Sequence, residues 1–289
     1  MQARQATLVG FGAVLLWSLL ALLTVWTAPV PPFQLNAMAF AVAGVSGLVW
    51  TWLRGISVAE VLRRTSPAAW CIGVVGLFGY HALYFSALRL APPAEAGLIA
   101  YLWPLLIVLF SGLLPGERLR AGHVVGALVA FAGAAIVVLG GASQGAAPAP
   151  AAGFALAFLC ALTWSGYSVL SRLVSRTPTE AVTFFCLTAA ALSGVTHMLV
   201  EPTRWPVGPV GHLAVLGLGL GPVGLAFFLW DVGVKRGDIR LLGVFSYAAP
   251  ILSTAILVGA GEAHGGLRLV SAAFLVAGGA FVAARAGRR

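Results

Sequence analysis

The chain carries matching residues at nearly constant spacing, which indicates that one unit of sequence occurs twice. A Trp-Ser pair stands at Trp17-Ser18 and again at Trp164-Ser165, 147 residues later. A proline inside an apolar segment stands at Pro104 and again at Pro250, 146 residues later. These positions fall within hydrophobic stretches rather than in loops. Internal repeats of this kind are a common way of building membrane proteins.

The composition is that of an integral membrane protein. Of the 289 residues, 60% are hydrophobic and 9% are charged, whereas soluble domains contain about 25% charged residues. A membrane-spanning helix needs about 20 consecutive apolar residues, and the short alternating segments of a transmembrane β-barrel do not occur in the chain. We therefore predict an all-α integral membrane protein with ten transmembrane helices, near residues 7–27, 33–53, 68–89, 92–115, 121–140, 152–172, 179–200, 210–234, 239–260 and 267–285.

An uncharged segment rich in alanine, glycine and proline divides the predicted helices into two sets of five. It covers residues 141–151 and has the composition of a linker. We predict a first five-helix repeat over residues 1–140 and a second over residues 152–289. Because five is odd, the second repeat begins on the opposite side of the membrane, so the two repeats are inverted.

The formal net charge of +9 is explained by where the Lys and Arg residues lie relative to the membrane. If the N-terminus is cytoplasmic, 14 of the 17 Lys and Arg residues fall on the cytoplasmic side. This asymmetry is typical of membrane proteins and predicts that both termini are cytoplasmic. The basic excess therefore gives no reason to expect a nucleic-acid partner.

Several aromatic residues depart from the usual distribution, in which Trp and Tyr collect at the membrane surfaces. Six of the nine tryptophans lie at or near the ends of predicted helices, as expected: Trp26, Trp50, Trp52, Trp70, Trp205 and Trp230. The other three lie near the middle of their helices: Trp17, Trp103 and Trp164. All five tyrosines also avoid the helix ends: Tyr80, Tyr84, Tyr101, Tyr167 and Tyr247.

A hydroxyl or indole N–H in the middle of a membrane needs a hydrogen-bonding partner, so these residues are not expected to face lipid. Taken singly, each ring could also lie between two helices, with its polar group hydrogen-bonded there. As a set at one depth in repeat-related helices, they favour a central, aromatic-lined cavity.

The two prolines of the repeat, Pro104 and Pro250, each remove a backbone hydrogen bond in the middle of a helix and bend it. A tyrosine precedes each of them by three residues. A passive bend that improves packing is one interpretation. The equal depth of the two bends in inverted halves favours the other, that they are hinges.

Ionisable residues within the predicted helices are few. Asp231 and Lys235 are four residues apart, in the order that favours an ordinary ion pair. His81 lies nearer the centre of its helix, where a histidine is a candidate functional residue. A neutral histidine that donates one hydrogen bond is the alternative, and the sequence does not separate the two.

The residues that are absent limit the chemistry. A carboxylate in the middle of the first helix could exchange protons for cationic drugs, but Trp17 and Ser18 occupy that depth. No Lys or Arg lies at mid-membrane, where it could bind phosphorylated cargo. The chain has neither an HExxH motif nor a phosphate-binding loop, and no metal-ligand spacing links its three cysteines. We expect no enzymatic activity, no metal and no cofactor.

The fifth and tenth predicted helices carry small residues at four-residue spacing, which permits close contact between helices. These residues are Gly122, Gly126, Ala130 and Ala134 in one helix, and Ala273 and Ala277 in the other. We expect both to be packing helices. A homodimer formed through them is the second interpretation.

Together these features resemble the drug/metabolite transporter superfamily in its ten-helix, EamA-type form. The resemblance is carried by Leu16-Trp17-Ser18 and Thr163-Trp164-Ser165 in the first helix of each repeat, by Tyr84–Arg89 and Trp230–Lys235 at the ends of the third helices, and by the segments from Pro104 to Glu117 and from Pro250 to Glu262 in the fourth. It covers almost the whole chain.

The resemblance implies an exporter of the bacterial inner membrane, in which helices 1–4 and 6–9 surround a cavity and helices 5 and 10 lie outside it. Within the superfamily the sequence looks most like exporters of aromatic amino acids. Helix 9 has Ala249 before its proline where helix 4 has Trp103, so one wall of the cavity is less bulky. The substrate-binding residues implied are Trp17, His81, Tyr84, Tyr101, Trp103, Trp164 and Tyr247.

We therefore predict an exporter of neutral amino acids, including aromatic ones, that works by alternating access with Pro104 and Pro250 as hinges. Its partners would be the small-molecule substrate and membrane lipid. One alternative is an exporter of other metabolites or drugs on the same fold. The other is a structural or lipid-handling membrane protein that transports nothing.

Overall fold

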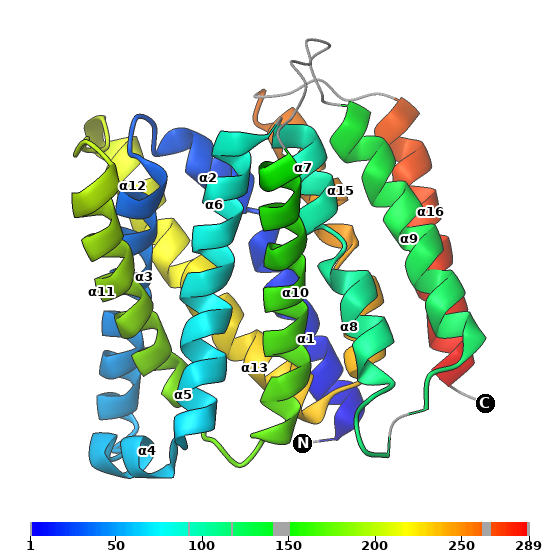
Figure 1. The fold of residues 1–289 in the computed structure, drawn as a ribbon, viewed down its shortest axis with the longest axis horizontal. Helices are drawn as coiled ribbons and strands as arrows, with labels where there is room; N and C mark the ends of the chain where they lie inside the picture. Colours follow the sequence, from blue (N-terminus) through cyan, green and yellow to red (C-terminus); the bar gives the residue numbers. More distant parts are fainter. Residues whose placement is uncertain (1, 92, 117, 141–150, 262–266, 288–289) are drawn as a thin grey trace.

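The structure is a computed structural model that describes residues 2–91, 93–116, 118–140, 151–261 and 267–287. Within these ranges the secondary structure is helical, without a strand. The helices run side by side as an upright bundle, and α1 begins at the end of the bundle where α16 ends (Figure 1). Residues 141–150 of the expected linker lie outside the described ranges.

The first half of the chain contains nine α-helices and one π-helical turn, η1, within the described ranges. The elements are α1 (Ala3–Trp17), α2 (Leu20–Trp26), α3 (Pro32–Leu53), α4 (Val58–Arg64), α5 (Pro67–Val74), η1 (Val75–Gly79), α6 (Tyr80–Leu90), α7 (Pro93–Ala100), α8 (Trp103–Ser111) and α9 (Ala121–Gly140).

The second half contains seven α-helices and one π-helical turn, η2, within the described ranges. They are α10 (Ala151–Leu173), α11 (Ala181–Val200), α12 (Gly208–Leu220), η2 (Gly221–Leu225), α13 (Ala226–Arg236), α14 (Ile239–Phe245), α15 (Ala248–Gly259) and α16 (Leu267–Gly287).

Seven helical segments of the described chain are long and apolar enough to cross a membrane, so this is a multi-pass membrane protein. They span residues 3–26, 32–53, 67–88, 151–173, 181–200, 208–236 and 239–259, close to seven of the expected ranges. The expected range 92–115 holds two short helices, α7 and α8. The apolar stretches of α9 and α16, at Ala121–Gly133 and Val270–Ala283, are also shorter than the seven spanning segments.

The two π-helical turns begin at Val75 and at Gly221, 146 residues apart. This is the spacing of the two prolines in the sequence. A π-turn accommodates one extra residue in a helix and is frequent at functional sites. An irregular feature of the backbone thus recurs at the spacing that the sequence shows for the prolines.

Glycines allow the closest contacts between helices. α1 crosses α13 where Gly10 meets Gly233, and a Cβ added to Gly233 would lie 2.6 Å from the Gly10 Cα. α9 packs along α16 at one side of the bundle, where a Cβ added to Gly126 would lie 2.5 Å from the Gly279 carbonyl oxygen (Figure 1). Of the small residues noted in the sequence, Gly122, Gly126 and Ala130 of α9 thus serve a contact within one chain, whereas Ala273 and Ala277 of α16 are exposed and lie outside it. A homodimer through these helices would have to use their other sides.

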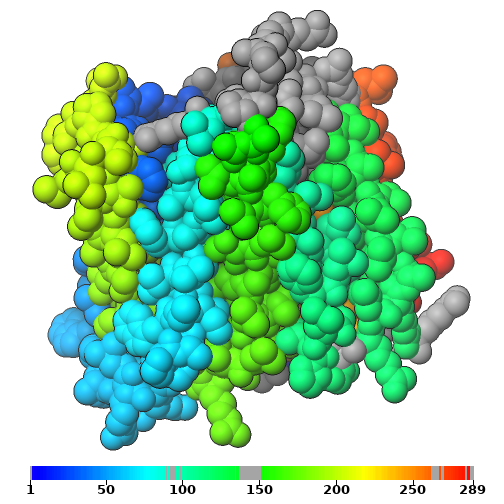
Figure 2. Space-filling model, in the orientation of Figure 1, coloured from blue at the N-terminus to red at the C-terminus, as the bar shows by residue number. Residues whose placement is uncertain are grey.

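The main hydrophobic core is formed mostly by residues of α1, α3, α10, α11 and α13. α6 and α10 lie next to each other along one face, with α8 and α9 beyond them (Figure 2). This core contains the aromatic residues described next.

Candidate functional site

Four tryptophans from four helices meet in the core. Trp17 ends α1, Trp103 begins α8, Trp164 lies in α10 and Trp230 lies in α13. All six pairs of rings are in contact, with centroids 5.0 to 6.3 Å apart. Aromatic pairs attract one another at this range. We call these four residues the tryptophan cluster.

Hydrogen bonds fix two of these indoles. The Trp17 Nε1–H donates to the carbonyl of Pro222, in η2, at 3.0 Å, and the Trp230 Nε1–H donates to Ser168 Oγ at 3.0 Å. A buried N–H that has a partner carries no desolvation penalty, so these bonds hold the rings in one orientation. The π-turn of the second half thus positions a tryptophan of the first half.

The position of Trp230 corrects the sequence analysis, which placed it with the tryptophans at the membrane surfaces. It is fully buried, at 0% exposure, in the middle of the tryptophan cluster. A signal was present in the sequence, because Trp230 lies 146 residues after Tyr84 and is its counterpart in the repeat. The sequence analysis matched these two segments but grouped Trp230 with the tryptophans at the helix ends.

Two predicted residues of α6, His81 and Tyr84, lie next to Tyr80, which contacts the cluster. The Tyr80 ring contacts Trp164 at 5.2 Å between centroids and stacks on Tyr84 at 6.0 Å. His81 packs against Tyr80 and against Phe40, each at 5.2 Å. The structure therefore brings His81 and Tyr84 to the cluster through Tyr80, which was noted in the sequence but was not among the predicted binding residues.

The hydrogen bond of His81 defines its tautomer. Its Nδ1 lies 2.6 Å from the carbonyl oxygen of Leu77, one turn earlier in η1. A carbonyl oxygen only accepts, so Nδ1 carries the hydrogen and Nε2 of the neutral ring is an acceptor. The interpretation of a neutral histidine with one local hydrogen bond fits this geometry, and it leaves the second nitrogen available to a ligand.

The two remaining predicted residues, Tyr101 and Tyr247, lie at the breaks before the prolines. Tyr101 is half-buried between α7 and α8, and it lies near Tyr80 and Tyr84. Tyr247 is fully buried and contacts Phe131 of α9 at 5.9 Å, in a second hydrophobic cluster. The structure therefore places Tyr247 apart from the other predicted residues.

Both predicted hinges coincide with interruptions of the helix. α7 ends at Ala100 and α8 begins at Trp103, while α14 ends at Phe245 and α15 begins at Ala248. The two prolines stand in the first turn after these breaks, where a missing N–H costs little. The breaks also lie close together, since a Cβ added to Gly243 of α14 would lie 2.9 Å from the Pro104 carbonyl oxygen.

The predicted ion pair between Asp231 and Lys235 is confirmed. Lys235 Nζ lies 2.8 Å from Asp231 Oδ1, and both side chains are buried. Thr179 Oγ1 donates to the other carboxylate oxygen at 2.7 Å, and Lys235 also donates to the Thr177 carbonyl at 3.0 Å. With these partners the pair is a structural connection from α13 to the segment before α11.

The site offers ring faces, phenol hydroxyls and one imidazole acceptor. Ring faces attract cations and stack on other rings, while hydroxyls donate to carboxylates. In the part of the chain that the structure describes, no group of three or more His, Cys, Asp or Glu residues could hold a metal ion. The arrangement is suited to binding a small amphipathic molecule.

Comparison with known proteins gives the family. The model of the EamA-like transporter family matches residues 4–139 and again residues 151–284. The chain belongs to the EamA-like transporter family. Its two matches repeat the division of the chain that the sequence indicates.

Among EamA-like transporters, the chain is 56% identical, over the full length of both, to the aromatic amino acid exporter YddG of Ancylobacter novellus. It is 28% identical to the protein of the same name in Salmonella typhimurium, over 89% of this chain and 88% of that one. It is also similar to a solved crystal structure with a TM-score of 0.92 and 54% identity, which covers 99% of both chains.

Proposed function

We propose that this EamA-like transporter exports neutral amino acids, including aromatic ones, across the bacterial inner membrane by alternating access. It would act as a carrier, not as an enzyme. The observation that carries the proposal is the tryptophan cluster, because it draws two rings from each half of the chain into one site. The name of the 56% identical relative supports aromatic amino acids as cargo.

Accessibility divides the proposed binding residues into two roles. Trp17, Tyr84 and Tyr101 keep part of their surface accessible, as do Tyr80 and His81. Trp103 and Trp164 are buried behind them. We assign the partly accessible rings to direct contact with the substrate and the buried indoles to support of those rings.

Each part of a zwitterionic amino acid has a suitable group in the site. The ammonium would rest over the face of Trp17 and donate to His81 Nε2. The carboxylate would accept from the hydroxyls of Tyr84 and Tyr101. An aromatic side chain would stack on the remaining ring surface, which favours aromatic over small cargo. Tyr247 would act at the break of its helix instead of in substrate contact.

The proposed architecture is ten transmembrane helices in two inverted repeats, residues 1–140 and 152–289, with both termini cytoplasmic. The common spacing of the prolines and of the π-turns supports two equivalent halves. α1 starts at the same end of the bundle where α16 ends (Figure 1). This arrangement supports an even number of membrane crossings. Rocking of one half against the other at the breaks before Pro104 and Pro250 would alternate the access.

The direct test is efflux of labelled phenylalanine and alanine from proteoliposomes that contain the purified protein. We expect phenylalanine efflux above that of empty vesicles and inhibition of it by unlabelled tryptophan. Rates equal to those of empty vesicles for every neutral amino acid would refute the proposal. Stronger inhibition by purines or cationic drugs than by any amino acid would instead identify an exporter of other metabolites.

A second measurement separates a carrier from a membrane protein that transports nothing. In a background without native cysteines, a cysteine at Trp17 or Tyr101 should react with a water-soluble thiol reagent. Protection of both positions under all conditions would argue against a hydrated path through the site.

A further inference from the structure

A pocket of about 380 Å³ lies between the start of α9 and the end of α16, away from the tryptophan cluster. It is lined by Ala121 and Gly122 of α9, by Val282 and Ala286 of α16, and by the side chains of Arg120 and Arg285. Its volume is in the range of small-molecule sites. The proposed transport path does not use it.

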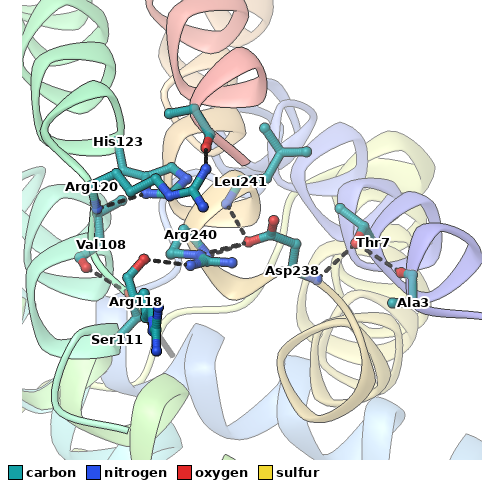
Figure 3. Close-up of polar contacts among 11 residues, drawn as sticks. Ala3, Thr7, Val108, Ser111, Arg118, Arg120, His123, Asp238, Arg240 and Leu241 are labelled. Atoms are coloured by element: carbon teal, nitrogen blue, oxygen red, sulfur yellow. Dashed lines mark hydrogen bonds and ion pairs between the residues drawn. The ribbon is translucent and has the colours of Figure 1, made fainter. Parts of the chain in front are cut away.

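The two arginines are held at this pocket without a carboxylate partner among the described residues. An Arg120 guanidinium nitrogen donates to the Ala286 carbonyl at 2.6 Å, which ties the two helices together. Arg285 lies over the ring of Phe281, 4.4 Å from its centroid. By contrast, the neighbouring Arg240 is paired with Asp238, with 3.3 Å between Nε and Oδ1 (Figure 3).

The pocket therefore has two positive charges that the described part of the chain does not neutralise. The backbone N–H of Arg120 is already bound to Nδ1 of His123, one turn into α9, which fixes the backbone that carries the arginine (Figure 3). The start of α9 adds the positive end of a helix dipole. A guanidinium pairs with the oxygens of a phosphate or carboxylate in a planar, two-pronged geometry, so such a pocket suits an anionic group.

Apolar side chains continue from the pocket along both helices. On α16, Phe281 and Phe274 lie one and three turns before Arg285 on the same face, and both rings are exposed. On α9, Val125 and Leu128 are exposed in the turns that follow Arg120. A charged pocket next to exposed apolar side chains of the same two helices matches a lipid, whose headgroup is charged and whose chains are apolar.

We propose that this pocket binds the headgroup of an anionic phospholipid, with its acyl chains along the exposed faces of α9 and α16. The site holds the two helices together at the membrane surface. This proposal requires only that the protein is inserted in a membrane, and it does not depend on the proposed transport. Basic pockets between transmembrane helices bind anionic lipids in other membrane proteins.

The test compares lipids on the purified full-length protein in detergent. Dioleoylphosphatidylglycerol, dioleoylphosphatidylcholine or inorganic phosphate is added, and the melting temperature and the number of lipids retained in native mass spectrometry are measured. We expect phosphatidylglycerol to raise the melting temperature by about 4 °C and to be retained, while the neutral lipid does neither.

Two double variants remove equal charge from different places. Arg120→Gln with Arg285→Gln should weaken phosphatidylglycerol binding by about fivefold for each arginine removed. The control, Arg54→Gln with Arg64→Gln, removes two exposed arginines at α3 and α4, at the same end of the bundle, and should leave binding unchanged (Figure 1). Arg285→Gln alone preserves the Arg120 bond to α16 and serves if the double variant does not fold.

Three results would overturn the proposal. Equal effects of the neutral and the anionic lipid would remove the role of the headgroup charge. Equal weakening by the control variant would assign the effect to overall charge. An equal shift with inorganic phosphate at the same concentration would make the site one for a free anion, not for a lipid.

Discussion

The hydroxyl of Tyr247 accepts a hydrogen bond from the backbone N–H of Leu105 at 3.0 Å. Leu105 belongs to the first turn of α8, whose N–H groups have no partner within the helix. Tyr247 itself stands at the break between α14 and α15. A side chain from one interrupted helix thus satisfies the backbone of the other, which couples the two proposed hinges directly.

Removal of this hydroxyl should destabilise the protein. In Tyr247→Phe the ring still packs on Phe131, but a buried N–H loses its acceptor, which costs about 1–3 kcal/mol. We expect a lower melting temperature in detergent. Tyr101→Phe, at the other break and half-buried, is the control and should change stability less. A Tyr247→Phe protein as stable as wild type would mean that water or another group serves this amide.

Truncation of Trp17 should weaken the binding of aromatic cargo more than that of small cargo. Trp17→Ala removes a ring that contacts Trp103, Trp164 and Trp230, and with it stacking of about 0.5–1.5 kcal/mol. We expect about a tenfold loss of apparent affinity for phenylalanine and a smaller loss for alanine in proteoliposome transport. Trp52→Ala, at a ring that is 77% exposed, should leave both unchanged. Equal losses for the two amino acids would place Trp17 outside the side-chain subsite.

The proline after the second break should matter more for transport than for stability. Pro250→Ala allows the backbone between α14 and α15 to become continuous, which would stiffen a proposed hinge. We expect slower efflux per folded molecule, with a melting temperature that is unchanged or higher. Efflux is normalised to monodisperse protein recovered from the vesicles. An unchanged rate would show that the bend is passive.

The buried ion pair allows a double-mutant cycle. Asp231→Asn or Lys235→Met alone leaves the other group buried without its partner, which costs about 3–5 kcal/mol. The double variant should lose clearly less than the sum of the single losses. Unfolding in mixed micelles gives the free energies. Additive losses would show that the two charges do not depend on each other.

The close packing of α9 on α16 is tested by two adjacent glycines. A Cβ at Gly279 would lie 2.8 Å from the Ala130 amide nitrogen, whereas a Cβ at Gly278 would meet nothing within 4 Å. Gly279→Ala should therefore destabilise by about 1–3 kcal/mol, and Gly278→Ala should not. Thermal unfolding in detergent measures both. Equal stability of the two variants would mean that the helices can separate at no cost.

The sequence predicted well those features that depend on local pattern. The apolar runs predicted seven of the ten expected spanning segments to within a few residues, because a membrane helix must satisfy its own backbone and cover the hydrocarbon core with apolar side chains. The pair Asp231–Lys235 followed from four-residue spacing, which places the two side chains on one face of α13. Both follow from helix geometry alone.

The sequence did not predict which side chains meet across helices. The sequence analysis placed Trp230 at a helix end, yet α13, which follows a π-turn, directs it into the tryptophan cluster. The small residues of α9 predicted a packing helix but not its partner, which is Gly279 of α16 where it lies against Gly126. Such choices depend on helix rotation and on neighbours more than 100 residues away.

Hydropathy and the length of the apolar segments were enough to predict a helical membrane protein, because both are properties of the chain alone. The packing of the helices, by contrast, brings Trp17, Trp103, Trp164 and Trp230 into one cluster and leaves Tyr247 in another. The physical reason is that periodicity gives the face of a helix, whereas the partner of that face depends on how closely the backbones can approach, as Gly10 and Gly233 show where α1 crosses α13.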